Sequence, residues 1–251
     1  MHKVIINSDD FGYSCGINYG IVDAYLKGIL TSTTIMANMP GFDHAVELKK
    51  ENPDLGVGVH LTLTCGKPLL DDVPSLIQVN GDFHKLSFYK QDFSIDQDEL
   101  YREWDTQIQK VYEAGIEPTH LDSHHHTHTI GINQDVVVNL AKKYSLPVRR
   151  NFEKNALVKT TSYFEENFDI IGDPKNIEGN LDVYLDNLVK KLKAYESTEI
   201  MCHAGYIDKA ILNGSSFIFP RAYQTDFLIN SSFAKKLLND ASIQLVHYGA
   251  I

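Results

Sequence analysis

Cysteine is scarce in this chain, and its three cysteines, Cys15, Cys65 and Cys202, are far apart in the sequence. An odd number of isolated cysteines argues against a disulfide framework and is typical of a reducing compartment. The chain also lacks an apolar run of membrane-spanning length, and it starts without a basic-then-apolar signal region. We therefore expect a cytoplasmic protein with no membrane partner.

Positive charge is in the minority: 23 Lys and Arg face 33 Asp and Glu, a formal net charge of -10. This balance argues against a nucleic-acid partner. A Gly-rich phosphate loop and a dinucleotide fingerprint are also missing, so we expect no organic cofactor. The hydrophobic fraction of 43% is ordinary for a globular protein, and 251 residues suit one catalytic domain, residues 1–251.

Histidine, in contrast, is concentrated in residues 119–128, which hold five of the 11 histidines and one aspartate. Imidazole and carboxylate groups are the ligands of borderline divalent metals. In an extended strand, one face would carry His120, Asp122, His124, His126 and His128. One metal needs two or three of them, so the others should orient ligands, move protons or touch substrate. The alternative is a solvated His-rich loop.

Polar groups also end three apolar segments that read as buried strands. Residues 4–8 stop at Asp9 and Asp10, and two carboxylates so close suggest one metal ligand and one base. His60 lies in the apolar run 55–63, and His203 ends the run that starts at residue 199. Taken singly, the aspartates could cap a helix, and either histidine could be a satisfied core residue.

Strand-like and helix-like segments alternate along the chain. We predict strands at residues 3–8, 33–38, 56–61, 119–123, 147–151, 199–203 and 243–248. Helical apolar stripes occupy residues 98–114 and 181–195. About seven βα units predict an α/β fold, a (β/α) barrel that could be distorted or incomplete. All four chemical motifs follow predicted strands, where such barrels carry their active sites.

Together, these motifs resemble the YdjC-like carbohydrate deacetylase family, most closely its chitooligosaccharide deacetylases. The resemblance runs in order through residues 7–12, 18–21, 28–34, 58–64, 66–68, 118–128, 201–203, 207–208 and 219–221. It departs at Ala204, where the family usually has proline, and at Asp226, where many members have glutamate.

The resemblance implies a polysaccharide-deacetylase-like fold that hydrolyses the N-acetyl group of chitooligosaccharides and releases acetate. It implies Asp10, His60 and His124 as metal ligands and Asp9 as catalytic base. By analogy with polysaccharide deacetylases, it also implies His203 as general acid. Such a ligand set suits one divalent ion, Mg²⁺ or Zn²⁺, with Mn²⁺, Co²⁺ and Ni²⁺ as alternatives. Spacing alone does not separate His124 from His126 or His128 as the third ligand.

The implied substrate is a small N-acetylated sugar, which could be phosphorylated, and we expect Asp122, His126 and Arg149 to contact it. Arg149 could bind a phosphate with its planar fork, or simply pair with an acidic neighbour. Residues 65–94 have no helical period and read as a long active-site insertion. Its aromatic residues, Phe83, Phe88, Tyr89 and Phe93, could stack on sugar rings or fix the loop to the body.

Two other classes of protein remain open from the sequence. One is a metal-dependent phosphoesterase or another amidohydrolase on a similar barrel, which would often hold more than one metal. The other is a non-catalytic sugar- or metal-binding protein, which would not need a base and an acid beside the ligands. The native metal, the length of the sugar and the oligomeric state, a homodimer included, are also left open.

Overall fold

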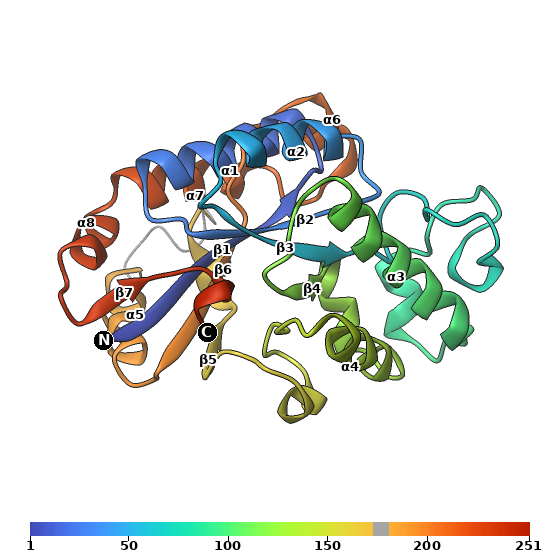
Figure 1. Ribbon diagram of the computed structural model, residues 1–251. Coiled ribbons are helices and arrows are strands. Elements are labelled where there is room, and N and C mark those ends of the chain that lie inside the picture. Colours follow the sequence, from blue (N-terminus) through green and yellow to red (C-terminus); the bar gives the residue numbers. More distant parts are fainter. Residues whose placement is uncertain (173–180) are drawn as a thin grey trace.

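The computed structural model describes residues 1–172 and 181–251 (Figure 1). At its centre is a sheet with the strand order β4-β3-β2-β1-β6-β5, and β7 pairs with the start of β1. The strands are β1 (His2–Phe11), β2 (Ser32–Ile35), β3 (Gly56–Leu61), β4 (Leu121–Ser123), β5 (Tyr163–Glu165), β6 (Ser197–Cys202) and β7 (Ile243–Leu245). All of these pairings are parallel, so the strand ends gather at one edge. The predicted α/β class and incomplete barrel are confirmed.

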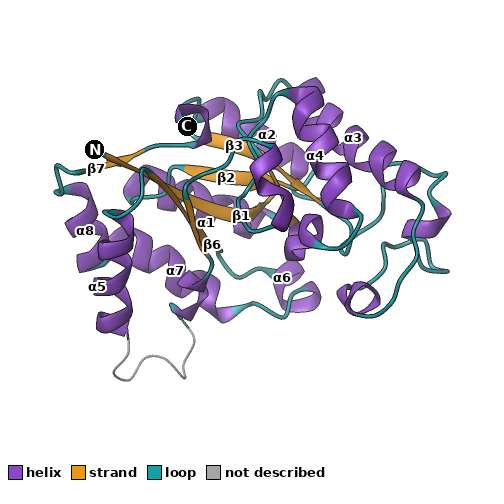
Figure 2. Cartoon of the chain, turned by 90° about the horizontal axis from the view of Figure 1, so that it is seen from below, coloured by secondary structure: helices purple, strands orange, loops and turns teal. Residues whose placement is uncertain are grey.

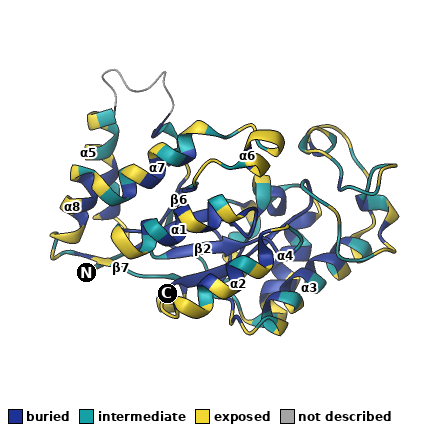
Figure 3. Ribbon diagram, turned by 90° about the horizontal axis from the view of Figure 1, so that it is seen from above, coloured by how far each residue is buried: buried dark blue, intermediate teal, exposed yellow. Residues whose placement is uncertain are grey.

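Helices pack around the sheet and turn their exposed sides outward (Figures 2 and 3). They are α1 (Cys15–Lys27), α2 (Phe42–Glu51), α3 (Gln97–Glu113), α4 (Asn133–Tyr144), α5 (Leu181–Leu192), α6 (Lys209–Gly214), α7 (Phe219–Asn230) and α8 (Ser232–Leu238). The helix predicted at 98–114 is confirmed: its apolar stripe, from Leu100 to Val111, is buried, and Asp96 caps its first turn. In the described parts of the chain, no helix is long and apolar enough to cross a bilayer.

The predicted strand at residues 147–151 is the main error in the secondary structure. The segment forms only a single bridge, between Val148 and Leu121. Pro147 has no amide hydrogen to donate, and the N–H of Val148 turns away to the carbonyl of Lys159. The strand that pairs with β6 is β5, and not residues 147–151. The sequence does not predict β5, because three residues are too few to show a strand period.

Residues 65–94 contain no α-helix, only the 3₁₀ turns Pro74–Leu76 and Leu86–Lys90. Phe83 and Tyr89 are buried, and the Tyr89 ring makes edge contacts with the rings of Phe88 and Phe93. These aromatic residues therefore fix the segment to the body of the protein. None of them lines the main cavity, so the structure gives no support to sugar stacking at these positions.

Candidate functional site

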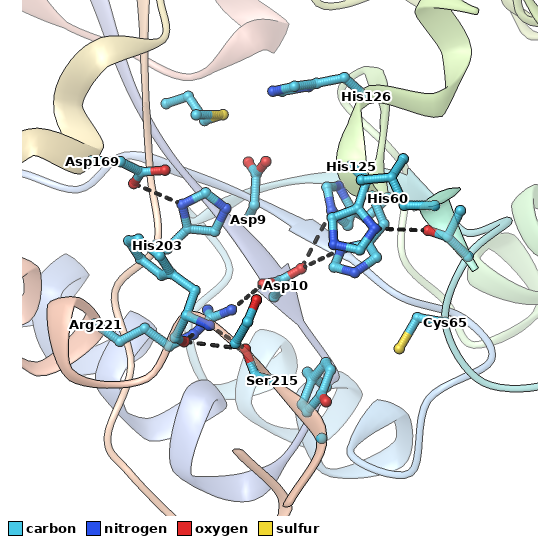
Figure 4. A pocket seen from close by; sticks show the side chains of 18 of the residues that line it. Asp9, Asp10, His60, Cys65, His125, His126, Asp169, His203, Ser215 and Arg221 are labelled. Atoms are coloured by element: carbon cyan, nitrogen blue, oxygen red, sulfur yellow. Dashed lines mark hydrogen bonds and ion pairs between the residues drawn. The ribbon is translucent and has the colours of Figure 1, made fainter. Parts of the chain in front are cut away.

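A cavity of about 680 Å³ opens at the edge where the strands end (Figure 4). Six of the predicted site residues line it: Asp9, Asp10, His60, His124, His126 and His203. They come from β1, β3 and the turns after β4 and β6, segments far apart in the sequence. The segment 65–94 contributes Cys65 and residues 85–87 to the lining, and the chain from the end of α6 onward contributes residues 214–217.

An irregularity in β1 explains how two consecutive aspartates reach the same cavity. The register between β1 and β2 shifts between Ser8 and Phe11, and Asp10 has a φ of 73°. A bulge of this kind re-aims side chains that would otherwise alternate between the two faces. Neither aspartate caps α1, because Ser14 does so by accepting a hydrogen bond from the N–H of Ile17.

Asp10, His60 and His124 form a compact set of metal donors. The Oδ1 atom of Asp10 lies 3.0 Å from Nδ1 of His124 and 3.4 Å from Nε2 of His60. One donor atom from each residue lies within 4.8 Å of the others. Two imidazole nitrogens and one carboxylate oxygen, from the ends of β1, β3 and β4, fit a divalent ion that keeps open positions.

The orientation of His60 supports this fit. His60 is the register partner of Asp122 across β3 and β4, and Nδ1 of His60 lies 2.7 Å from Oδ1 of Asp122. A carboxylate can only accept, so Nδ1 donates its proton to Asp122, and Nε2 is the nitrogen that faces Asp10, where a bound ion would replace its proton. Metal-binding histidines typically donate in this way to a carboxylate behind them. Burial alone would lower the pKa of His60, but the carboxylates, Asp122 first, raise it to about 10.

Asp9 lies beside the donor set and is held by a buried arginine. Nη1 and Nη2 of Arg149 donate to the two carboxylate oxygens of Asp9, at 2.8 and 2.6 Å. Burial alone would raise the pKa of Asp9, but the Arg149 guanidinium overrides it and holds that pKa well below its usual range. Asp9 is therefore an ionised carboxylate with a fixed orientation.

The structure differs from our expectation of substrate contact at Arg149 and Asp122. Both side chains are 0% exposed, and neither lines the cavity. The fork of Arg149 is already occupied, because it pairs with Asp122 and Glu199 as well as with Asp9. A phosphate group could not reach it without breaking these buried ion pairs, so Arg149 is better placed to orient Asp9.

The predicted alternation through the histidine-rich segment is also wrong. The chain leaves the extended conformation after Ser123, and His125 and His126 have φ angles of 55° and 54°. As a result, His128 turns inward to Ser123 and Asn151, away from the cavity. His126 does line the cavity; its buried Nδ1 has no partner within the described chain. Burial and then Arg149 lower the pKa of His126 to about 3, so its ring is neutral near pH 7.

His203 stands across the cavity from the metal donors, and Figure 4 shows its ring between Asp169 and Asp9. Its Nδ1 donates to Oδ1 of Asp169 at 2.9 Å, which leaves Nε2 on the opposite side of the ring. Gln224 fixes the backbone by accepting from the N–H of His203. Burial alone would lower the pKa of His203, but the Asp169 carboxylate raises it above its ordinary value.

Two further residues contact His203 and Asp10 in this cavity, and neither was predicted from the sequence as a site residue. Asp169 lies in a short 3₁₀ turn after β5 and carries no motif that would single it out. Arg221, at the start of α7, donates from Nη2 to Oδ2 of Asp10 at 2.6 Å. It does belong to the segment 219–221 quoted for the family resemblance, but that resemblance gave it no role.

These observations define a class of protein: an α/β half-barrel with a candidate carboxylate–histidine metal site at its strand ends. The chain belongs to the YdjC-like protein family, whose model matches residues 3–239. It is 43% identical to a carbohydrate deacetylase of Halalkalibacterium halodurans, over 93% of this chain and 98% of that one. A carbohydrate deacetylase of Brevibacillus brevis is 39% identical, over 99% of both chains.

A solved structure extends the similarity to the whole fold. A candidate cellobiose-phosphate cleavage protein of Enterococcus faecalis superimposes with a TM-score of 0.87 and 32% sequence identity. The match covers 99% of this chain and 98% of the other. The predicted family is thereby confirmed.

Proposed function

We propose that this protein is a metal-dependent carbohydrate deacetylase that removes the N-acetyl group of chitooligosaccharides and releases acetate. One observation carries the proposal: a compact set of metal donors lies between an arginine-held carboxylate, Asp9, and an aspartate-held histidine, His203. Hydrolysis of an amide needs a base for the water and an acid for the amine, and this cavity offers both. The names of the relatives support the sugar substrate.

In this mechanism Asp10, His60 and His124 hold the ion, which when bound lowers the pKa of water and polarises the carbonyl. Asp9 accepts a proton as the water attacks the acetamide carbon. Arg149 keeps that carboxylate ionised and oriented. His203, protonated because Asp169 raises its pKa, then gives a proton to the departing amine. His126, neutral and with a free Nδ1, is placed to bind a sugar hydroxyl.

Acetate release from N-acetylated chitooligosaccharides, with and without added divalent metals, tests this function. We expect release only with metal, at one ion per chain. Hydrolysis of a phosphate ester at two or more ions per chain would favour the phosphoesterase alternative. Sugar binding without acetate release would favour a non-catalytic sugar-binding protein.

Asp169→Asn should move the alkaline limb of the rate profile to lower pH. The raised pKa of His203 keeps it protonated as pH rises, and activity is lost once pH passes that value. Removing the Asp169 charge lowers this pKa, so the loss begins earlier. The measurement is kcat/KM against pH, with the exposed Asp72→Asn variant as control. An unmoved limb would show that His203 is not the acid.

The substrate proposal includes a sugar phosphate, and Lys85 is the residue we assign to it. The name of the Enterococcus faecalis relative includes a phosphorylated disaccharide. Among the described residues, the lysine and arginine side chains that line this cavity are Lys85 and Arg221, and Arg221 is paired with Asp10. Lys85 forms no ion pair with any residue the structure describes, so it is free to bind an anionic substituent.

Lys85→Ala should therefore lower kcat/KM selectively for the 6-phosphate of diacetylchitobiose. We expect a loss of about tenfold or more relative to the unphosphorylated sugar, as for a charged hydrogen bond of ~1.5–3 kcal/mol. Lys67→Ala is the matched control, because Lys67 is in the same segment but does not line the cavity. Equal losses on both sugars would remove Lys85 from phosphate recognition.

A further inference from the structure

We propose that Arg221 is a catalytic residue whose Nη1 binds the acetyl oxygen, first as the amide carbonyl and finally as an oxygen of acetate. The inference rests on the proposed deacetylase function and assigns a residue to the acyl end of the substrate. The guanidinium of Arg221 is buried in the cavity wall, and one of its nitrogens has no hydrogen-bond partner among the described residues (Figure 4).

Two of the three nitrogens of Arg221 have clear partners. Nη2 donates to Oδ2 of Asp10 at 2.6 Å, and Nε donates to the carbonyl of Phe217 at 2.8 Å. These bonds anchor the guanidinium plane between the end of β1 and the loop before α7. Nη1 is buried and has no partner among the described residues. A buried donor without an acceptor is costly, and more so when it belongs to a charged group.

The other buried arginine of the site provides a comparison. Arg149 uses Nε, Nη1 and Nη2, all bonded to carboxylates, as expected of a residue that only supports others. Arg221 binds Asp10 through Nη2 alone. Nη1 therefore remains available to a molecule that enters the cavity.

The position of Asp10 indicates which part of that molecule Nη1 meets. Its Oδ2 atom faces Arg221, and its Oδ1 atom faces His60 and His124. The free arm of Arg221 thus lies next to the donor set, where the acyl group must come to be attacked. Nη1 is almost enclosed, which suits a small planar acceptor such as an acetyl oxygen better than a sugar ring.

The chemistry at this oxygen explains the value of a fixed donor. Water adds to the carbonyl carbon, and the electron pair of the C=O bond moves onto the oxygen. The pair returns as the C–N bond breaks, the amine takes a proton, and acetate leaves with the same oxygen. A donor already in place stabilises the charge that develops on the oxygen without reorganisation.

Arg221→Lys tests the inference, because the single lysine nitrogen can still neutralise Asp10 but leaves no counterpart of Nη1. We expect the dissociation constant for the metal, measured by calorimetric titration, to stay within a few-fold of wild type. Acetate should bind at least about tenfold more weakly, and kcat should fall by about 10²–10³-fold, as when one such donor is removed. Arg102→Lys, at an exposed ion pair with Asp72, is the matched control and should change none of these values.

Unchanged acetate binding by Arg221→Lys would overturn the proposal, as would a loss of metal that accounts for the whole loss of kcat. If the variant unfolds, nitrogen NMR of the arginine side chains in the wild type decides. A shift of the Arg221 signals on acetate titration supports the proposal, and unchanged Arg221 signals refute it. Acetate binding does not depend on turnover. A wild type that binds acetate through Arg221 but releases none from sugars would therefore count against the proposed function, not against this contact.

Discussion

His60→Ala and His124→Ala should each abolish binding of one metal ion per chain, and catalytic activity with it. The three donor residues lie on different strand ends, so each deletion removes one ligand from the cavity edge without opening the core below. Loss of a supporting residue behind a ligand already costs about 10–100-fold in affinity, and loss of the ligand itself should exceed that. Metal content by elemental analysis and calorimetric titration measures the effect.

A remote histidine provides the control for this experiment. His2→Ala, at the opposite end of β1, should keep full metal content. Asp122→Asn should have an intermediate effect, because it weakens the hold on His60 but leaves the ligands in place. If His124→Ala kept one ion per chain, His126 would be the third ligand. His128 is not a candidate, since Ser123 and Asn151 bind both nitrogens of its ring.

The sequence was sufficient to predict the position of the site because of how parallel strands are built. Apolar runs that stop at Asp9–Asp10, His60 and His203 mark strand ends, and in an all-parallel sheet such ends meet at one edge. The convergence of these residues in one cavity follows from topology. The choice of His124 over its neighbours came from the family resemblance, since spacing did not decide it.

The supporting residues could not be predicted, because they act across long sequence separations. Arg149 reaches Asp9 over 140 positions, and Asp169 reaches His203 over 34. The periodicity of apolar and polar residues within a segment gives no information about contacts between distant segments. The local rules also failed where the backbone is irregular: the bulge at Asp10 and the left-handed residues His125 and His126 break the alternation on which face assignments depend.

The adjacent aspartates should give opposite phenotypes when each is changed to asparagine. Asp9→Asn should keep metal affinity within a few-fold of wild type but lower kcat by about 10²–10⁴-fold, the usual contribution of a general base. The asparagine keeps one oxygen for Arg149, which also remains paired with Asp122 and Glu199. Asp10→Asn should instead weaken metal binding, and excess metal should restore part of its activity.

The outcome that would contradict this division is equal loss of metal by both variants. The ion would then lie in the second candidate set, formed by Asp9, His60 and Asp122, whose donor atoms are also within 4.8 Å of one another. We expect this set to stay free of metal, because Nη2 of Arg149 already lies 2.6 Å from Asp9 and 2.9 Å from Asp122. Arg149 occupies both carboxylate oxygens of Asp9, whereas Arg221 binds only Oδ2 of Asp10 and leaves Oδ1, beside the two imidazoles, for the ion.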